Sequence, residues 1–343
     1  MAKRPLLRVA AALMASVVII YLLSIVKSGP SSAPDFECVT SQPSQTSQID
    51  ISSGETGSEI ARELFEKGVV KSSESFFRVA VSDPRSSSIA PGVHIIDQEI
   101  CAADALIQLL DSKRIAGLIA ISEGAWSREI KELFIKSGYP KIEVDRAFDS
   151  ARVPKPFTTL EGLLFPSQYS FAQGTSAADA LQLIVDRGVS ELTNLGIVDG
   201  NKKFTAQELL VIASIIQAEG DEKDFTKVAR VIYNRLAVGM PLQMDSTVHY
   251  IKGTRGSVFL STNSTLIKSP YNTYRNYGLP PGPIGNPGES ALQAALSPTQ
   301  GDWLYFITVA PGDTRFTSTL TEFNEWKVLY KSNLRAGKFG EGK

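Results

Sequence analysis

The sequence contains few of the residues that most often bind metals. Only two histidines, His94 and His249, occur in 343 residues, so no helix carries the two histidines four residues apart of a common zinc motif. No phosphate-binding Gly-Lys-Ser/Thr loop is present either. We therefore expect no metal and no other cofactor.

An excess of charge of one sign is also missing. The chain has 35 Lys and Arg against 36 Asp and Glu, for a formal net charge of -1. Without a basic field, no nucleic-acid partner is predicted. With 43% hydrophobic and 21% charged residues, the composition is that of a globular protein with room for about two domains.

Charged residues are absent from one apolar segment, residues 9–26, which is about the shortest length that can cross a bilayer as a helix. Three basic residues precede it within residues 1–8, which predicts a cytoplasmic N-terminus and an extracytoplasmic remainder. A cleaved signal peptide is the alternative, but the run stays apolar to its end, without a small-residue cleavage site. We expect a single-pass protein of the cell membrane.

Residues 27–47 are rich in Ser, Pro and Gln, which predicts a flexible linker between the membrane and the folded part. The two cysteines, Cys38 and Cys101, would lie in an oxidising compartment. The sequence leaves two alternatives open for them, a disulfide bond or two free thiols.

An internal repeat with an offset of 70 residues follows the linker. Each copy reads as a strand, a Gly turn, an amphipathic helix and a Gly stop, and Thr56 with Glu59 forms a capping box in the first copy. Chance similarity of two such units is the alternative. The pattern predicts a small non-catalytic α/β subdomain over residues 48–145. The matched residues are Ile51, Ser52, Gly54, Glu59, Ile60 and Gly68 with Ile121, Ser122, Gly124, Glu129, Ile130 and Gly138.

Residues 146–340 are predicted to form a second, mixed α and β domain. Three helices are marked by N-terminal caps or by helical apolar spacing; one begins after the capping box Thr205 and Glu208 and ends at Gly220. Residues 303–309 form a compact apolar strand pattern. The whole chain is therefore predicted to have an α+β fold.

Glu219 is the strongest candidate for a catalytic residue. It lies seven residues after Ile212, so it continues the apolar stripe of its helix. Burial and the negative end of the helix dipole both raise the pKa of a carboxyl group in this position. A carboxyl group that keeps its proton near neutral pH is suited to general acid catalysis. The alternative is a frayed helix end that turns Glu219 to water.

The sequence around Glu219 resembles that of one family. Ala213-Ser214-Ile215-Ile216-Gln217-Ala218-Glu219 is similar to the signature Ala-Ser-Ile-Ile/Val-Glu-Lys-Glu of the endolytic murein (peptidoglycan) lytic transglycosylases, the YceG-like family. Gln217 departs from this signature. Arg315 stands where a histidine is common in the family, so no role is assigned to Arg315 or Glu322. Further similar motifs, in family order, are Glu161-Gly162-Leu163-Leu164-Phe165-Pro166, Tyr233-Asn234-Arg235-Leu236, Leu242-Gln243-Met244-Asp245-Ser246-Thr247-Val248, Tyr271-Asn272-Thr273-Tyr274, Gly278-Leu279-Pro280-Pro281-Gly282-Pro283-Ile284 and Asn286-Pro287-Gly288.

The resemblance implies an activity and a setting. The expected enzyme cleaves the bond between N-acetylmuramic acid (MurNAc) and N-acetylglucosamine (GlcNAc) in nascent glycan strands near the membrane. Glu219 would be the acid, and the product would carry 1,6-anhydro-MurNAc ends. A LysM-like character of the first subdomain, a membrane anchor and cell-wall synthases as partners are also implied. The alternative function is a non-catalytic, membrane-anchored peptidoglycan-binding scaffold for those synthases.

Substrate contacts are expected in the motifs that follow Glu219. Tyrosine rings offer flat faces to sugars, short polar side chains suit hydroxyl and acetamido groups, and a proline-rich loop loses little entropy when a chain docks. Core packing is the alternative for the tyrosines, and a turn or cap is the alternative for Asp245. The predicted substrate-binding residues are Gln243, Asp245, Tyr271, Asn272, Tyr274, Pro281 and Asn286.

Overall fold

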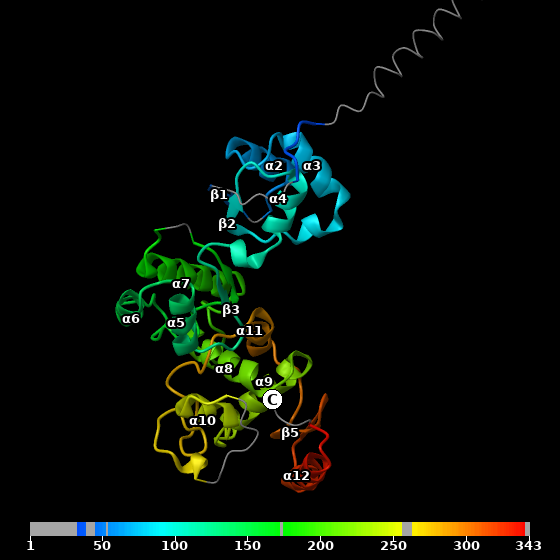
Figure 1. The fold of residues 1–343 in the computed structure, drawn as a ribbon. Helices are drawn as coiled ribbons and strands as arrows, with labels where there is room; N and C mark the ends of the chain where they lie inside the picture. The colour runs from blue at the N-terminus through cyan, green and yellow to red at the C-terminus, as the bar shows by residue number, and fades with distance from the viewer. Residues whose placement is uncertain (1–32, 39–44, 53, 172–173, 256–262, 340–343) are drawn as a thin grey trace, which may run out of the picture. The chain divides into compact units, whose positions relative to one another are not determined.

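The computed structural model describes residues 33–38, 45–52, 54–171, 174–255 and 263–339. They fall into two units, Met1–Ala116 and Gly117–Lys343, each considered by itself (Figure 1). The predicted span at 9–26 lies outside the described residues. No helix in the described part is long and apolar enough to cross a bilayer.

The described residues of the first unit form a two-stranded antiparallel sheet packed against three helices. Ile49 and Ile51 point from the first strand into a core with Leu64, Phe76 and Leu106, all at most 4% exposed. The sheet pairs β1 (Thr46–Ile51) with β2 (Gly92–Asp97), and the helices are α2 (Gly57–Glu66), α3 (Ser73–Ser82) and α4 (Ala102–Leu109), with 3₁₀ turns at Pro84–Ser88 and Ser112–Arg114.

The two cysteines form a disulfide bond, which decides between the two alternatives left open by the sequence. Cys101 is the residue before α4, and Asp35 accepts hydrogen bonds from the first backbone N–H of that helix at 3.1 and 3.2 Å. Ser72 donates to the carbonyl of Pro34 at 2.7 Å. Residues 33–38, predicted as linker, are therefore attached to the first unit.

The second unit is mixed α and β, in agreement with the predicted fold class. The strands in its described part form two separate antiparallel pairs, β3 (Ile119–Ile121) with β4 (Ser167–Tyr169) and β5 (Tyr305–Ala310) with β6 (Asp313–Thr317). The helices are α5 (Ser127–Lys136), α6 (Lys141–Asp149), α7 (Ala177–Asn194), α8 (Ala206–Glu219), α9 (Phe225–Ala237), α10 (Asp245–Lys252), α11 (Glu289–Leu296) and α12 (Leu320–Arg335), with 3₁₀ turns at Glu222–Asp224 and Ser264–Leu266.

Helix α8 is the centre of the second unit. All residues from Leu209 to Ile216 are buried, and α9, α10 and α11 pack around the helix (Figure 1). The predicted capping box starts it: the backbone N–H of Glu208 donates to Thr205 at 3.3 Å, and the Glu208 carboxylate accepts from the Thr205 backbone at 2.8 Å. The helix ends before Gly220, so Glu219 is its last residue.

Both copies of the predicted repeat have the same local structure but belong to different units. Gly54 and Gly124 follow a strand with φ of 84° and 72°, where glycine is favoured, and each precedes a helix whose third residue, Glu59 or Glu129, accepts from the backbone N–H of the residue before the helix at 2.8 Å. In the second copy, Ile130 and Phe134 pack into the core of the second unit. The chain divides into its two units between residues 116 and 117, whereas the sequence predicts a boundary between residues 145 and 146.

Candidate active site

Glu219 lies at the C-terminal end of α8, where buried residues give way to partly exposed ones. Ile212, Ile215 and Ile216 are fully buried, and the Glu219 side chain is half-buried. Burial raises its pKa to about 7, and the nearby charge of Asp245 acts in the same direction. The group therefore keeps its proton over much of the neutral range.

Ser246 fixes the position of the Glu219 carboxyl group. Its backbone N–H donates to Oε1 at 3.0 Å and its hydroxyl donates to the same oxygen at 2.5 Å. This N–H belongs to the first turn of α10, where backbone donors lack partners within the helix. Among the described residues nothing donates to Oε2, so this oxygen is available to deliver a proton.

Asp245 and Tyr274 lie beside the acid. The Tyr274 hydroxyl donates to Asp245 Oδ1. Burial first, and then this bond, raise the pKa of the Tyr274 hydroxyl, which stays protonated. Asp245 itself is exposed, in the first turn of α10, so it combines an acceptor role with the helix-start position considered as its alternative.

A buried arginine supplies positive charge to the same region. Arg235, on α9, is 6% exposed and donates through Nε to the carbonyl of Leu304 at 2.7 Å and through Nη1 to that of Leu242. It forms no ion pair within the described part of the chain. Burial lowers its pKa, and the charge of Glu219 opposes that effect. The guanidinium in turn favours the ionised form of Glu219.

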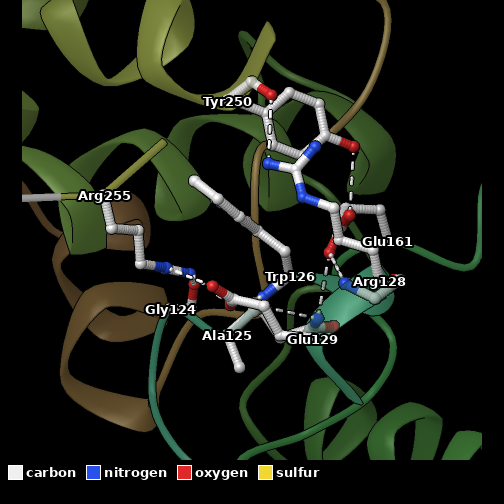
Figure 2. A network of polar contacts seen from close by, with 10 residues as sticks. Gly124, Ala125, Trp126, Arg128, Glu129, Glu161, Tyr250 and Arg255 are labelled. Carbon is white, nitrogen blue, oxygen red and sulfur yellow. Dashed lines mark hydrogen bonds and ion pairs between the residues drawn. The ribbon is translucent and has the colours of Figure 1, made fainter. Parts of the chain in front are cut away.

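A second carboxyl group with a raised pKa, that of Glu161, is buried and joins four segments of the unit (Figure 2). It accepts from the backbone of Ser127, the amide of Asn286 and the hydroxyl of Tyr250, each at 3.0 Å. Burial raises its pKa to about 7, although the hydrogen bonds from Ser127 and Tyr250 lower it. Tyr250 and Ser246 both lie on α10. The hydrogen bonds of Glu161 therefore help to fix the position of α10, whose Ser246 binds Glu219.

Comparison with known proteins identifies the family to which this site belongs. The family model described as YceG-like matches residues 49–328. The chain belongs to the YceG-like family. It is 35% identical over 320 residues to an endolytic murein transglycosylase of Bacillus subtilis, over 87% of this chain and 88% of that relative.

Two further comparisons agree. An endolytic murein transglycosylase of Streptococcus pneumoniae is 35% identical over 185 residues, which are 51% of this chain and 30% of that relative. A crystal structure of a yceG-like protein from Listeria monocytogenes matches with a TM-score of 0.55 and 28% identity, over 82% of this chain and 99% of that one.

The structure of this YceG-like protein separates the predicted substrate-binding residues into two groups. Gln243, Asp245 and Pro281 are exposed, and Tyr271 and Tyr274 are half-buried, so they can reach a ligand. Substrate contact stays a prediction for all of them. Gln243 has φ of 50°, which is strained for a residue with a side chain, and its backbone N–H donates to the carbonyl of Thr273 at 3.0 Å.

Asn272 and Asn286 differ from that group because both are fully buried. Asn272 donates to the carbonyls of Thr265 and Ile267 at 3.0 and 2.7 Å. Asn286 accepts from the backbones of Gly162 and Leu164 at 2.9 and 2.8 Å and donates to Ala125 and Glu161. Their geometry favours support of the surrounding loops over direct contact with substrate.

Ser246, Arg235 and Glu161 were not predicted as site residues. Each lies in a motif that the family resemblance covers, but local pattern did not distinguish them. A signal existed for Glu161, which directly precedes the apolar run Gly162-Leu163-Leu164-Phe165 and is therefore a charged residue at the edge of a core segment. Ser246 gave no such signal, because its partner lies 27 residues away in sequence.

Proposed function

We propose that this protein is an endolytic lytic transglycosylase that cleaves the MurNAc–GlcNAc bond of peptidoglycan and leaves 1,6-anhydro-MurNAc ends. The observation that carries the proposal is Glu219, a carboxyl group with a pKa of about 7 held by Ser246 at the end of a buried helix. The name of the relatives from B. subtilis and S. pneumoniae supports it.

In the proposed reaction Glu219 acts first as an acid and then as a base. Its proton passes from Oε2 to the bridging oxygen, and the bond from that oxygen to C1 of MurNAc breaks. The 6-hydroxyl of the same MurNAc attacks C1 and gives its proton to the Glu219 carboxylate. Oxygen O6 replaces the bridging oxygen on C1, no water is consumed, and the acid is regenerated.

The neighbours of Glu219 support both halves of this cycle. The two hydrogen bonds from Ser246 and the positive charge of Arg235 stabilise the carboxylate that forms when the proton leaves. Burial and Asp245 favour the return of the proton. Since the 6-hydroxyl is the nucleophile, the reaction needs no second carboxylate to activate water.

The setting of the enzyme is part of the proposal. An anchor at residues 9–26 would place both units outside the cytoplasm and close to nascent strands, where synthases are the expected partners. The first unit would act as a LysM-like, non-catalytic module. A purely binding scaffold is less consistent with the site, because a protein that only binds has no use for a carboxyl group with a raised pKa at a helix end.

The substitution Glu219→Gln tests the proposal. The amide keeps the shape of the side chain and the acceptor for Ser246 but carries no transferable proton. General acid catalysis is worth about 10² to 10⁴ in rate, so anhydro ends should fall by about that factor while strand binding persists. Mass spectrometry of digested strands measures the products.

Glu222→Gln, on the exposed turn after α8, is the matched control and should keep near wild-type yield. Normal yield from a folded Glu219→Gln protein would contradict the assignment. Reducing ends in place of anhydro ends would show hydrolysis instead.

A further inference from the structure

A cavity of about 250 Å³ lies next to the proposed acid on the second unit. Ser246, which holds Glu219, forms part of its wall, and Ala218, the residue before Glu219, forms another part. Its other polar walls include Glu123, Gln217 and Arg255. A group bound there would therefore lie close to the residue that holds the proposed acid.

One wall of the cavity offers fixed hydrogen-bond donors. The Arg255 guanidinium stacks 4.0 Å from the centre of the Trp126 ring (Figure 2). Nε and Nη2 are held by the Glu129 carboxylate at 2.6 and 2.7 Å, and Nη2 also donates to the carbonyl of Gly124 at 2.6 Å. Nη1 donates to none of the described residues. Arg255 is thus positioned before a ligand arrives, which lowers the entropy lost on binding.

Another wall offers a hydrogen-bond acceptor. Glu123 is exposed, and its Oε2 accepts from the amide of Gln217 at 3.2 Å, while the Gln217 oxygen accepts from the backbone of Gly288 at 2.9 Å. Nothing in the described part of the chain donates to Glu123 Oε1. The amide at position 217 makes this arrangement work, because a carboxylate there would repel Glu123 and could not donate to it.

The cavity therefore presents, in a small space, the Nη1 donor group of an arginine that is ion-paired with Glu129 and the Oε1 acceptor of the Glu123 carboxylate. Such a site suits a ligand with both acceptor and donor groups. The sugar rings of peptidoglycan carry no charge, whereas the peptide stem on the lactyl group carries N–H donors, carbonyls and carboxylates. At about 250 Å³ the cavity is smaller than the ≈300–1,000 Å³ typical of pockets for drug-sized ligands, so only a short segment fits.

We infer that this cavity binds the first residues of the peptide stem, with stem carbonyl or carboxylate oxygens on Arg255 and stem N–H groups on Glu123. The inference rests on the proposed function and adds a substrate preference to it. The enzyme should cleave strands that carry stems more efficiently than strands without them.

The test compares two substrates, glycan strands with intact stems and the same strands after removal of the stems by an amidase. The full-length protein in detergent is assayed for anhydro ends on both, and the ratio of kcat/KM values is the readout. Wild-type protein should favour strands with stems by about tenfold or more, the usual effect of a charge-assisted hydrogen bond. Arg255→Ala should bring this ratio close to one, mainly through KM.

Two more variants make the test decisive. Arg128→Ala removes the guanidinium on the other side of Trp126, 3.9 Å from the ring and outside the cavity, and should leave the ratio as in wild type. Glu123→Gln keeps the fold because the site is exposed, and should also lower the ratio.

Equal cleavage of both substrates by wild type, or an equal loss on both in Arg255→Ala, would overturn the inference and leave the proposed function standing. Absence of anhydro ends from both substrates would overturn the proposed function itself.

Discussion

The raised pKa of Glu219 predicts that the acid destabilises its own fold at high pH. A carboxyl group whose pKa rises from 4.5 unfolded to about 7 folded binds its proton more tightly in the folded state. Its contribution to stability is fully present below about pH 4.5 and is lost as pH rises through about 7. At 1.36 kcal/mol for each pKa unit, the loss amounts to about 3 kcal/mol.

Glu219→Gln should remove this loss, because an amide does not titrate. The free energy of unfolding of the variant relative to wild type should therefore increase by about 3 kcal/mol between pH 4.5 and pH 8. Glu161, whose pKa burial also raises to about 7, is present in both proteins, so its effect cancels in the difference.

Urea unfolding followed by tryptophan fluorescence measures this quantity, at several pH values and constant ionic strength. The three tryptophans, Trp126, Trp303 and Trp326, all lie in the second unit, so the signal reports the unit that carries Glu219. Glu222→Gln is the control and should run parallel to wild type. If the Glu219→Gln curve is parallel as well, the carboxyl group is not destabilised by burial and the argument for its acidity fails.

Three further predictions concern the acid, the disulfide and the topology. Ser246→Ala removes a charge-assisted hydrogen bond to Glu219, so the pKa of the acid should rise and the alkaline limb of the kcat/KM profile should move up by about one pH unit or more; an unmoved limb would contradict the contact. Cys38→Ser should destabilise the first unit by a few kcal/mol at most, and thiol counting on unreduced wild-type protein should find no free cysteine. A reporter fused after Lys343 should be active only outside the cytoplasm, and cytoplasmic activity would contradict the predicted orientation.

Local pattern predicted the elements of the fold better than their assembly. The capping box at Thr205 and Glu208 and the glycine after Glu219 are short-range signals, so the bounds of α8 followed from sequence. Tertiary contacts decided where the second repeat belongs, because Ile130 and Phe134 are buried against a core that includes Leu163 and Leu164. No spacing within the repeat carries that information.

Close helix packing, invisible in local pattern, also shapes the site. Gly188, in the middle of α7, packs against the backbone of Leu163. A Cβ at position 188 would lie 2.0 Å from the Leu163 backbone oxygen. Only glycine allows α7 to approach this segment so closely, although glycine weakens a helix. The segment that α7 contacts is the one that carries Glu161, so this packing helps to place Glu161.

Two helix ends of opposite polarity meet at Glu219, and their balance suits a group with two tasks. The C-terminal end of α8 and burial favour the neutral acid, whereas the first turn of α10, through Ser246, favours the carboxylate. A pKa far below 7 would leave too little acid to protonate the leaving oxygen, and one far above 7 would make that acid a poor donor. A residue that donates and then recovers one proton works best between these limits. The opposite effects of the two helix ends therefore support the proposed role of Glu219 in both steps.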